Sequence, residues 1–241
     1  MWRWFVIGGV CALMLGPLGN ADAQVGAGVR YQNLSDGYWH DVFASAGGHY
    51  RDQRTMLYAT YWFRLKEKRM EFLPEVGYFT TFGEIDSEAG NRSSGWYVQL
   101  NMDLYLLDFG SDCNCPTFSK QNDFFKRGFF IEISPGYEMR SIEVTRTVTD
   151  TSQYPVRTTR KFNNNGFKIA GSLGLDIGIS DLLTITPLVG LSFHSGTEWS
   201  GLTNFLDADV AADDDRHVDS DLALNAGLRL LFRPDYIRGR R

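Results

Sequence analysis

Apolar and polar residues alternate one by one along several long stretches of this chain. Within residues 95–109, the even positions from Trp96 to Leu106 are all apolar, whereas the odd positions from Tyr97 to Tyr105 are polar or tyrosine. A period of two that persists over such a length indicates a β-strand with one apolar face and one polar face. The sequence has no long helical heptad pattern, so we expect an all-β fold.

The alternation recurs at seven places from residue 56 onward: 57–65, 71–82, 95–109, 129–140, 167–178, 183–194 and 221–232. An up-and-down barrel with both termini at one end needs an even number of strands, so residues 24–55 must supply an odd number. Of two strand-like pieces there, 25–33 and 42–50, we expect one to span, which makes eight strands. Ten strands result if residues 144–165 contain another one. We interpret that stretch instead as a long hairpin beyond the membrane.

The composition agrees with a folded β chain. The 241 residues are 43% hydrophobic, 14% aromatic and 22% charged, which excludes a disordered chain, a collagen and a coiled coil. This length suits one large β domain or two small domains. The formal net charge of −5 argues against a general nucleic-acid surface.

The first 23 residues have the layout of a secretory signal peptide. Arg3 supplies a positive start, residues 5–15 are uncharged and mostly apolar, and Ala21-Asp22-Ala23 is a small-x-small cleavage site. Neither this run nor any later one is long enough to cross a bilayer as a helix. We expect residues 1–23 to be the signal peptide, 24–232 the barrel and 233–241 a basic tail. The alternative for the first segment is a buried N-terminal helix.

The connections between the expected strands are of two kinds. Residues 66–70 and 180–181 are short links, whereas 84–94, 144–165 and 195–219 are long and polar. Short turns at one end and long loops at the other are typical of outer-membrane barrels. The link 110–127 departs from this rule, because it is long and falls on the short-turn side.

Three features favour an apolar face that points outward to lipid. The polar face is rich in glycine and serine, as a narrow lumen requires. Aromatic residues gather at both ends of the apolar face, where the two bilayer interfaces would lie, and the strands are long enough for a tilted span. The alternative is a soluble periplasmic barrel or sandwich with the apolar face inside.

The last strand carries a local motif. In residues 225–232, Asn225 is polar, Gly227 and apolar Leu230 follow, and Phe232 closes the segment. With this motif the chain resembles the small bacterial outer-membrane β-barrel proteins of the OmpA and OmpX type, in which such a terminal strand is read by the barrel assembly machinery. The resemblance implies that machinery, outer-membrane lipid and lipopolysaccharide as partners. The family usually ends at the aromatic residue, whereas here residues 233–241 follow.

The polar face predicts a lumen filled by ion pairs. Eight strands enclose a space that side chains just fill, and buried charges must pair because unpaired ones cost several kcal/mol each. The charged residues expected to form this network are Arg30, Arg64, Glu75, Asp103, Glu132, Glu138, Arg140, Lys168, Asp176 and Arg229. We expect a plugged barrel that acts through its external loops in envelope integrity or in binding and adhesion. A narrow channel for small solutes is the alternative.

Other candidate sites have simpler explanations. His194, Ser195 and Glu198 bring to mind lipid A-modifying barrel enzymes, which are the second alternative, but adjacent strand residues face opposite sides. Cys113 and Cys115 form a possible disulfide, since two sulfurs do not make a structural zinc site. The aspartates of residues 207–221 lack the pattern of a calcium loop. We expect no enzymatic activity, no cofactor and no metal.

Overall fold

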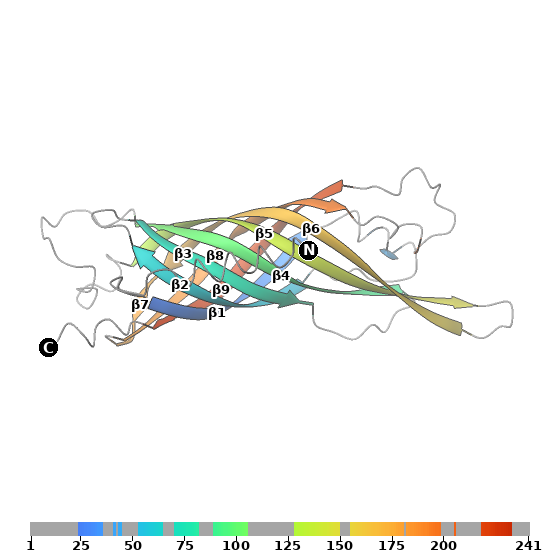
Figure 1. Ribbon diagram of the computed structural model, residues 1–241, viewed down its shortest axis with the longest axis horizontal. Coiled ribbons are helices and arrows are strands. Elements are labelled where there is room, and N and C mark those ends of the chain that lie inside the picture. Colours follow the sequence, from blue (N-terminus) through green and yellow to red (C-terminus); the bar gives the residue numbers. More distant parts are fainter. Residues whose placement is uncertain are drawn as a thin grey trace, which may run out of the picture.

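The chain forms a closed antiparallel β-barrel (Figure 1). The computed structural model describes residues 24–35, 41, 43–44, 53–64, 70–81, 89–105, 128–149, 155–180, 182–198, 205 and 218–232. The strands in these ranges are β1 (Gln24–Ser35), β2 (Gln53–Arg64), β3 (Met70–Thr80), β4 (Ala89–Leu104), β5 (Phe129–Thr149), β6 (Pro155–Leu175), β7 (Ile177–Gly178), β8 (Leu183–Glu198) and β9 (Val218–Phe232).

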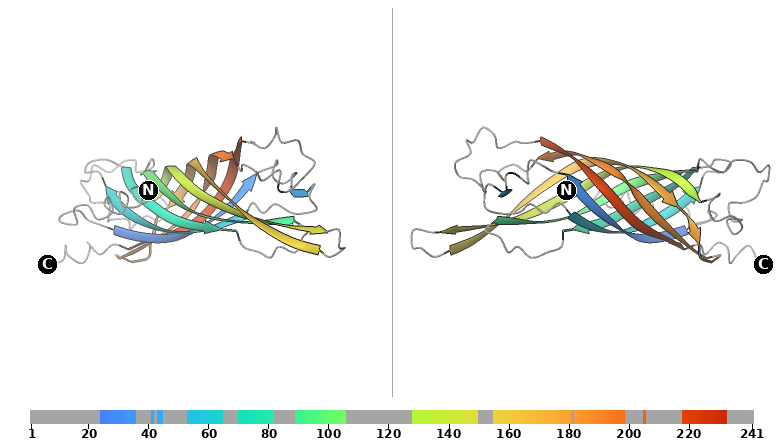
Figure 2. Two further views of the ribbon diagram at one scale, coloured as in Figure 1. Left: turned by 45° about the vertical axis from the view of Figure 1, so that its right-hand side comes forward. Right: turned by 180° about the vertical axis from the view of Figure 1, so that it is seen from behind.

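Eight strands make up the wall of the barrel in the part of the chain that the structure describes. The short β7 follows β6 after a single residue, and both pair with β8, so they act as one wall strand. Each strand pairs with its neighbour in sequence, and β1 pairs with β9 from Val25–Phe232 to Ser35–Leu222. Figure 2 shows this seam, where the blue and red strands lie side by side (right view). The prediction of eight strands is confirmed.

The first spanning strand is β1, so the piece expected at residues 25–33 crosses the wall. The second piece, 42–50, lies almost entirely outside the described residues. The expected link 110–127 lies outside the described residues; Tyr105 and Gly128, the described residues on either side of it, lie at the same end of the barrel as the short turns. No helix in the described ranges has the length and apolarity of a membrane span.

Strands β5 and β6 form a long hairpin that projects beyond the other strands (Figure 1). Their pairing is continuous from Phe129–Leu175 to Thr149–Pro155, so residues 144–165 belong to this hairpin and add no further wall strand. Residues 89–94, expected as loop, instead pair with β5 as the start of β4. The loop expected at 195–219 is likewise shortened, because β8 runs to Glu198 and β9 begins at Val218. Both faces are polar there, so the alternation that reveals a strand is missing.

The apolar face points outward along the whole wall. Trp96 and Phe167 keep 57% and 69% of their surface exposed, and the outward leucines of β9 are exposed as well. Exposed aromatic residues lie near both ends of this face: Phe63 and Phe72 stack at 5.5 Å on one side, and Tyr78 packs edge-on against Trp96 on the other. This is the apolar belt with two aromatic girdles that a membrane barrel presents to lipid.

Glycine residues lie on the inward face beside bulky aromatic rings. Gly77 lies beside the ring of Tyr97, and a Cβ atom at this position would come within 2.5 Å of that ring. Gly174 lies in the same way against the ring of Phe130. Glycine at these two positions therefore makes room for the aromatic side chains that fill the barrel.

A charge placed in the belt tests which face meets lipid. We expect Leu173→Arg, at an outward position of β6, to lower the free energy of unfolding by about 2–4 kcal/mol in lipid vesicles. Asn163→Arg is the matched control: it lies on the same strand and face but beyond the belt, and should change stability by less than about 0.5 kcal/mol. Urea unfolding in vesicles measures both. Equal small effects would mean that water covers the apolar face.

Candidate functional site: the lumen network

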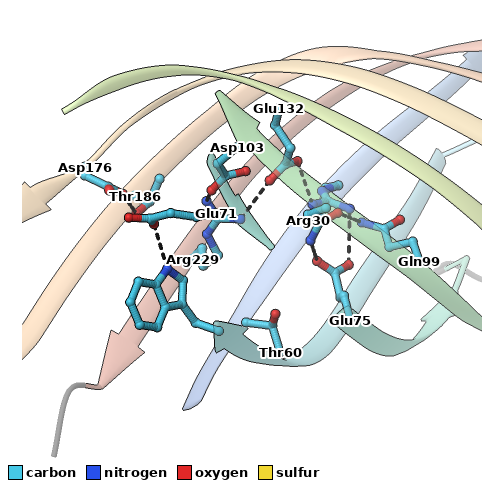
Figure 3. A network of polar contacts seen from close by, with 12 residues as sticks. Arg30, Thr60, Glu71, Glu75, Gln99, Asp103, Glu132, Asp176, Thr186 and Arg229 are labelled. Atoms are coloured by element: carbon cyan, nitrogen blue, oxygen red, sulfur yellow. Dashed lines mark hydrogen bonds and ion pairs between the residues drawn. The ribbon is translucent and has the colours of Figure 1, made fainter. Parts of the chain in front are cut away.

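The first of three polar clusters in the lumen is centred on Arg229. This fully buried side chain of β9 donates to Asp103 of β4 and to Glu132 of β5, each at 2.7 Å. The two contacts use separate nitrogens of one guanidinium, a geometry that suits its fixed fork. Figure 3 shows Arg229 between the two carboxylates, so the neighbouring strands β4 and β5 meet the distant strand β9 at one cation.

Arg30 of β1 lies next to this first cluster. Its guanidinium contacts Glu75 at 3.3 Å and Glu132 at 3.7 Å, so Glu132 links the two arginines. Glu75 also accepts hydrogen bonds at 2.8 Å from the hydroxyl of Tyr97 and the amide of Asn101. Both a cation and neutral hydrogen-bond donors therefore contact the buried carboxylate of Glu75. A carboxylate in a low-dielectric interior needs such partners, because its burial without them is costly.

The second cluster joins two carboxylates through a tyrosine near the short-turn end. The hydroxyl of Tyr105 lies 3.0 Å from Glu71 and 2.8 Å from Asp176. The indole of Trp62 donates to Glu71 at 2.6 Å, and Thr186 donates to Asp176 at 2.5 Å. Neutral donors thus surround both carboxyl groups, and they come from wall strands on different sides of the barrel.

The third cluster surrounds Glu138 of β5, nearer the long-loop end. Its carboxylate lies 3.6 Å from Arg54, 3.1 Å from Arg140 and 3.3 Å from Lys168. His194 of β8 completes the set, with Nδ1 at 3.3 Å. Four basic groups from four strands therefore converge on one carboxylate that has no exposed surface.

His194 connects this cluster to Ser192, which lies two residues earlier on the same inward face. Nε2 of His194 is 2.8 Å from Oγ of Ser192. The side-chain amide of Gln32 lies 2.8 Å from the same hydroxyl and 3.0 Å from the same ring nitrogen. Ser192, His194 and Glu138 are thus connected in that order by hydrogen-bond distances.

Aromatic rings pack between the charged side chains. Arg30 lies over Tyr58 at 5.1 Å, Arg54 over Phe79 at 4.9 Å, and Lys168 over Tyr97 at 3.9 Å from the ring centre. These rings are almost completely buried. Cation–π contacts of this kind stabilise a cation where water is excluded.

Nine of the ten residues expected in the network have buried, inward side chains: Arg30, Glu75, Asp103, Glu132, Glu138, Arg140, Lys168, Asp176 and Arg229. The side chain of Arg64 lies outside the described part. The sequence analysis did not pick out Arg54, because β2 begins at Gln53 and the expected strand began only at residue 57. It placed Tyr97 and Tyr105 on the polar face of their strand, but it did not expect them or Trp62 to donate hydrogen bonds to the buried carboxylates.

The other candidate residues are placed differently. Ser195 is turned away from His194, and its hydroxyl donates to the backbone carbonyl of Phe167 at 3.3 Å, so these neighbours do not share a face. In the motif of β9, Asn225 and Gly227 face inward and Leu230 and Phe232 face outward. Cys113, Cys115, the side chain of Glu198 and residues 207–217 lie outside the described residues. Within those that are described, no three His, Cys, Asp or Glu side chains form a metal-binding group.

The geometry defines the class of protein. A closed antiparallel barrel with an exposed apolar belt, aromatic girdles and a buried charged interior is inverted with respect to a water-soluble barrel. This arrangement is stable only in a lipid environment. Closure of the barrel gives the backbone N–H and C=O groups of every wall strand a hydrogen-bond partner, and the apolar belt contacts hydrocarbon instead of water. The chain is a small transmembrane β-barrel of the bacterial outer-membrane type.

Solved structures of this architecture are similar to the chain in fold. Neisserial surface protein A is 7% identical, with 88% of this chain and 97% of that one covered and a TM-score of 0.41. Ail, the attachment invasion locus protein of Yersinia pestis, is 7% identical, with 88% and 99% covered and a TM-score of 0.43. A major outer membrane protein from Thermus thermophilus is 9% identical, with 87% and 99% covered and a TM-score of 0.42. No family model and no curated protein matches the sequence.

Removal of Arg229 tests the energetic role of the first cluster. We expect Arg229→Met to lower the free energy of unfolding by about 3–5 kcal/mol, because two buried carboxylates lose their shared cation. Exposed Arg92→Met is the matched control and should change stability by less than about 0.5 kcal/mol. Adding Asp103→Asn and Glu132→Gln to the first variant should recover part of the loss. A triple variant less stable than Arg229→Met would contradict this account.

Proposed function

We propose that the protein is a non-enzymatic outer-membrane barrel whose lumen is plugged by its own side chains and whose external sheet binds partners outside the cell. The observation that carries the proposal is the combination of a filled interior with a polar sheet that extends past the aromatic girdle. A barrel whose interior is filled by side chains acts at its surface, in binding, adhesion or envelope integrity.

The first support is the content of the lumen. Seven buried carboxylates face five buried cations among the described residues, and bulky rings such as Tyr97 and Phe130 occupy the cross-section between them. Opening an ion path would require several of these pairs to break at once, each at a cost of several kcal/mol. This favours a plug over the narrow channel.

The second support is the external sheet, which consists of residues 89–95 of β4, 140–149 of β5 and 155–166 of β6. Arg92, Glu143 and Lys161 form one cross-strand row on its outer face, and Lys161 keeps 58% of its side chain exposed. Arg157 and Arg160 are exposed nearby. Exposed cations therefore outnumber Glu143 on this sheet, although the whole chain has a net charge of −5.

A contact from another loop stabilises the sheet. The ring of Phe205, from the connection between β8 and β9, lies 6.0 Å from Phe162 and under Arg160 at 5.6 Å. Arg146 donates to the backbone carbonyl of Phe205 at 3.1 Å. A sheet held in this way presents its outer face as a fixed surface, which is an advantage for binding.

Export and assembly belong to the same proposal. Residues 1–23 act as the secretory signal peptide, and Asn225, Gly227, Leu230 and Phe232 act as the assembly signal read by the barrel assembly machinery. Residues 233–241 follow as a basic tail, and Cys113 with Cys115 supply the possible disulfide in the long link. Outer-membrane lipid and lipopolysaccharide surround the belt.

Conductance tests the plugged lumen against the channel. In planar lipid bilayers we expect the wild-type protein to show no steady conductance. A variant with Arg30, Tyr97 and Arg229 all replaced by alanine removes three large inward side chains and serves as the positive control for insertion. A steady wild-type current that rises in proportion to salt concentration would overturn the plugged lumen.

A charged polymer tests the external sheet. We expect the detergent-solubilised full chain to bind dextran sulfate and not uncharged dextran. The double variant Arg92→Gln with Lys161→Gln should weaken that binding about 30-fold, since each surface cation contributes about 1 kcal/mol. Glu143→Gln, from the same row, is the matched control and should bind as well as wild type or better. Equal binding by the wild type and the double variant would exclude this surface.

A further inference from the structure

The outer strand of the projecting hairpin has a neighbour on only one side over much of its length. β8 pairs with β6 from Gly174–Leu188 to Phe167–Ser195, and none of the described strands pairs with β6 on that side beyond this point. Residues 155–166 therefore have β5 on one side and an open edge on the other. In Figure 1 the tip of the hairpin extends past the ends of the other strands.

A register shift in β8 coincides with the start of this open edge. The pairing of β8 with β9 is irregular between His194 and Thr197 and then resumes at Thr197–Asp219. An irregularity of this kind bends a strand and increases its twist. β8 thus stays with β9 and parts from β6, which leaves β6 as the last strand of the external sheet.

Two contacts of backbone carbonyls show which groups of β6 point to the open edge. The carbonyl oxygen of Phe162 lies 3.5 Å from the hydroxyl of Ser141 on β5, and that of Phe167 lies 3.3 Å from the hydroxyl of Ser195 on β8. In an antiparallel ladder the N–H and C=O of one residue point to the same neighbour, and the direction alternates along the strand. Even-numbered residues of β6 therefore face β5, and odd-numbered residues face the open side.

Thr159, Lys161 and Asn163 are the odd-numbered residues in the middle of the open edge. Their side chains are exposed, and their backbone N–H and C=O groups have no partner strand in the described part of the chain. The N–H of Asn165 is instead accepted by the side-chain oxygen of Asn164, as expected for a group that no strand reaches. Such a row of donors and acceptors is a template for pairing with another chain.

The charge of β6 restricts which strand can pair with this edge. Residues 155–166 contain three basic residues and no acidic residue. Lys161 keeps 58% of its side chain exposed on the outer face, and Arg160 is exposed on the opposite face. The contact of Lys161 with exposed Glu143, at 3.9 Å, is a weak surface pair. A second copy of β6 would place like charges opposite each other, which destabilises a sheet, whereas a strand with carboxylates would be stabilised by the same cations.

We propose that the open edge of β6 binds an extended acidic segment of an external protein, which adds to the external sheet as a fourth strand. Strand addition gains affinity from main-chain hydrogen bonds and specificity from alternate side chains. Residues 157–163 span about 20 Å at the usual rise of a strand, so a segment of about seven residues fits. The proposal rests on the proposed function of the external sheet and names its partner as a polypeptide, because another backbone matches alternating donors and acceptors at this spacing.

Hydrogen exchange tests whether the edge is open in the full chain in detergent micelles. The backbone amides of Thr159, Lys161 and Asn163 should exchange rapidly with solvent, whereas those of Arg160 and Phe162, which face β5, should be protected. NMR spectroscopy of the amide protons measures both sets in one sample. Protection of both sets in the protein alone would overturn the proposal, because the chain itself would then cover the edge.

An acetylated peptide of eight residues, with alternating threonine and glutamate, serves as the partner strand. We expect fluorescence anisotropy to show binding to the wild-type chain, and the bound peptide should slow amide exchange at Thr159 and Lys161. The same peptide with glutamine in place of glutamate should bind about 10-fold more weakly, because each surface cation contributes about a factor of five. Equal binding of the two peptides, or no binding of the acidic one, would refute the acidic partner.

Thr159→Pro removes one N–H from the open edge and leaves the ladder to β5 intact, because the backbone of Thr159 points away from β5. We expect it to weaken peptide binding about 10-fold through the loss of a main-chain hydrogen bond. Thr159→Val is the matched control, since it keeps the N–H, and should bind like wild type. Slower migration on gels after boiling verifies that each variant is folded, and Asn163→Pro provides a second proline variant of the edge.

Dextran sulfate separates this proposal from the proposed function. Thr159→Pro keeps Arg92 and Lys161, so it should bind the polymer like wild type while its affinity for the peptide falls. A wild-type chain that binds dextran sulfate but not the acidic peptide would retain the binding surface and overturn strand addition alone. Dimers of the wild type that Thr159→Pro abolishes, measured by analytical ultracentrifugation, would identify a second copy as the occupant and would also overturn the proposal.

Discussion

Closure of the sheet between β1 and β9 is the constraint on which the rest of the structure depends. A strand edge left open in hydrocarbon would expose unpaired backbone groups, so only a closed barrel can span the membrane with strands. Closure with eight strands also fixes the interior at a width that side chains fill. Each polar inward residue must therefore form its hydrogen bonds or ion pairs with other inward residues. The polar faces of the strands together make up the core of the barrel.

The inward residues pair largely through their charges, and the balance of acidic and basic groups differs between the two ends of the barrel. Toward the short-turn end, Arg30 and Arg229 face five carboxylates: Glu71, Glu75, Asp103, Glu132 and Asp176. Neutral donors from tyrosine, tryptophan, threonine and asparagine make up the difference there. Toward the long-loop end the relation is reversed: Arg54, Arg140, Lys168 and His194 face two carboxylates, Glu138 and Asp221. Because Arg229 lies on β9 and Asp103 on β4, which do not pair in the wall, such contacts also hold together strands that are not neighbours.

The sequence predicts the wall of the barrel well. Successive residues of each wall strand face lipid and lumen in turn, so apolar and polar residues alternate with a period of two. The outward and inward faces of β4, β5, β6, β8 and β9 follow directly from it. At the start of β4, which pairs with the projecting hairpin, neither face is apolar, and the sequence analysis took residues 89–94 for a loop. The partners inside the lumen were also beyond reach, since the contact of Glu138 with Arg54 or His194 depends on strand tilt and stagger, which periodicity does not encode.

The same dense pairing also orders the uncharged polar side chains of the lumen. A histidine exposed to water rotates among several partners, whereas His194 is confined between Glu138 and Ser192. Arg140 and Lys168, which contact the same carboxylate, restrict it further, because neither can move without losing an ion pair of its own. The ion pairs that hold the strands together therefore also fix the positions of the neutral groups between them.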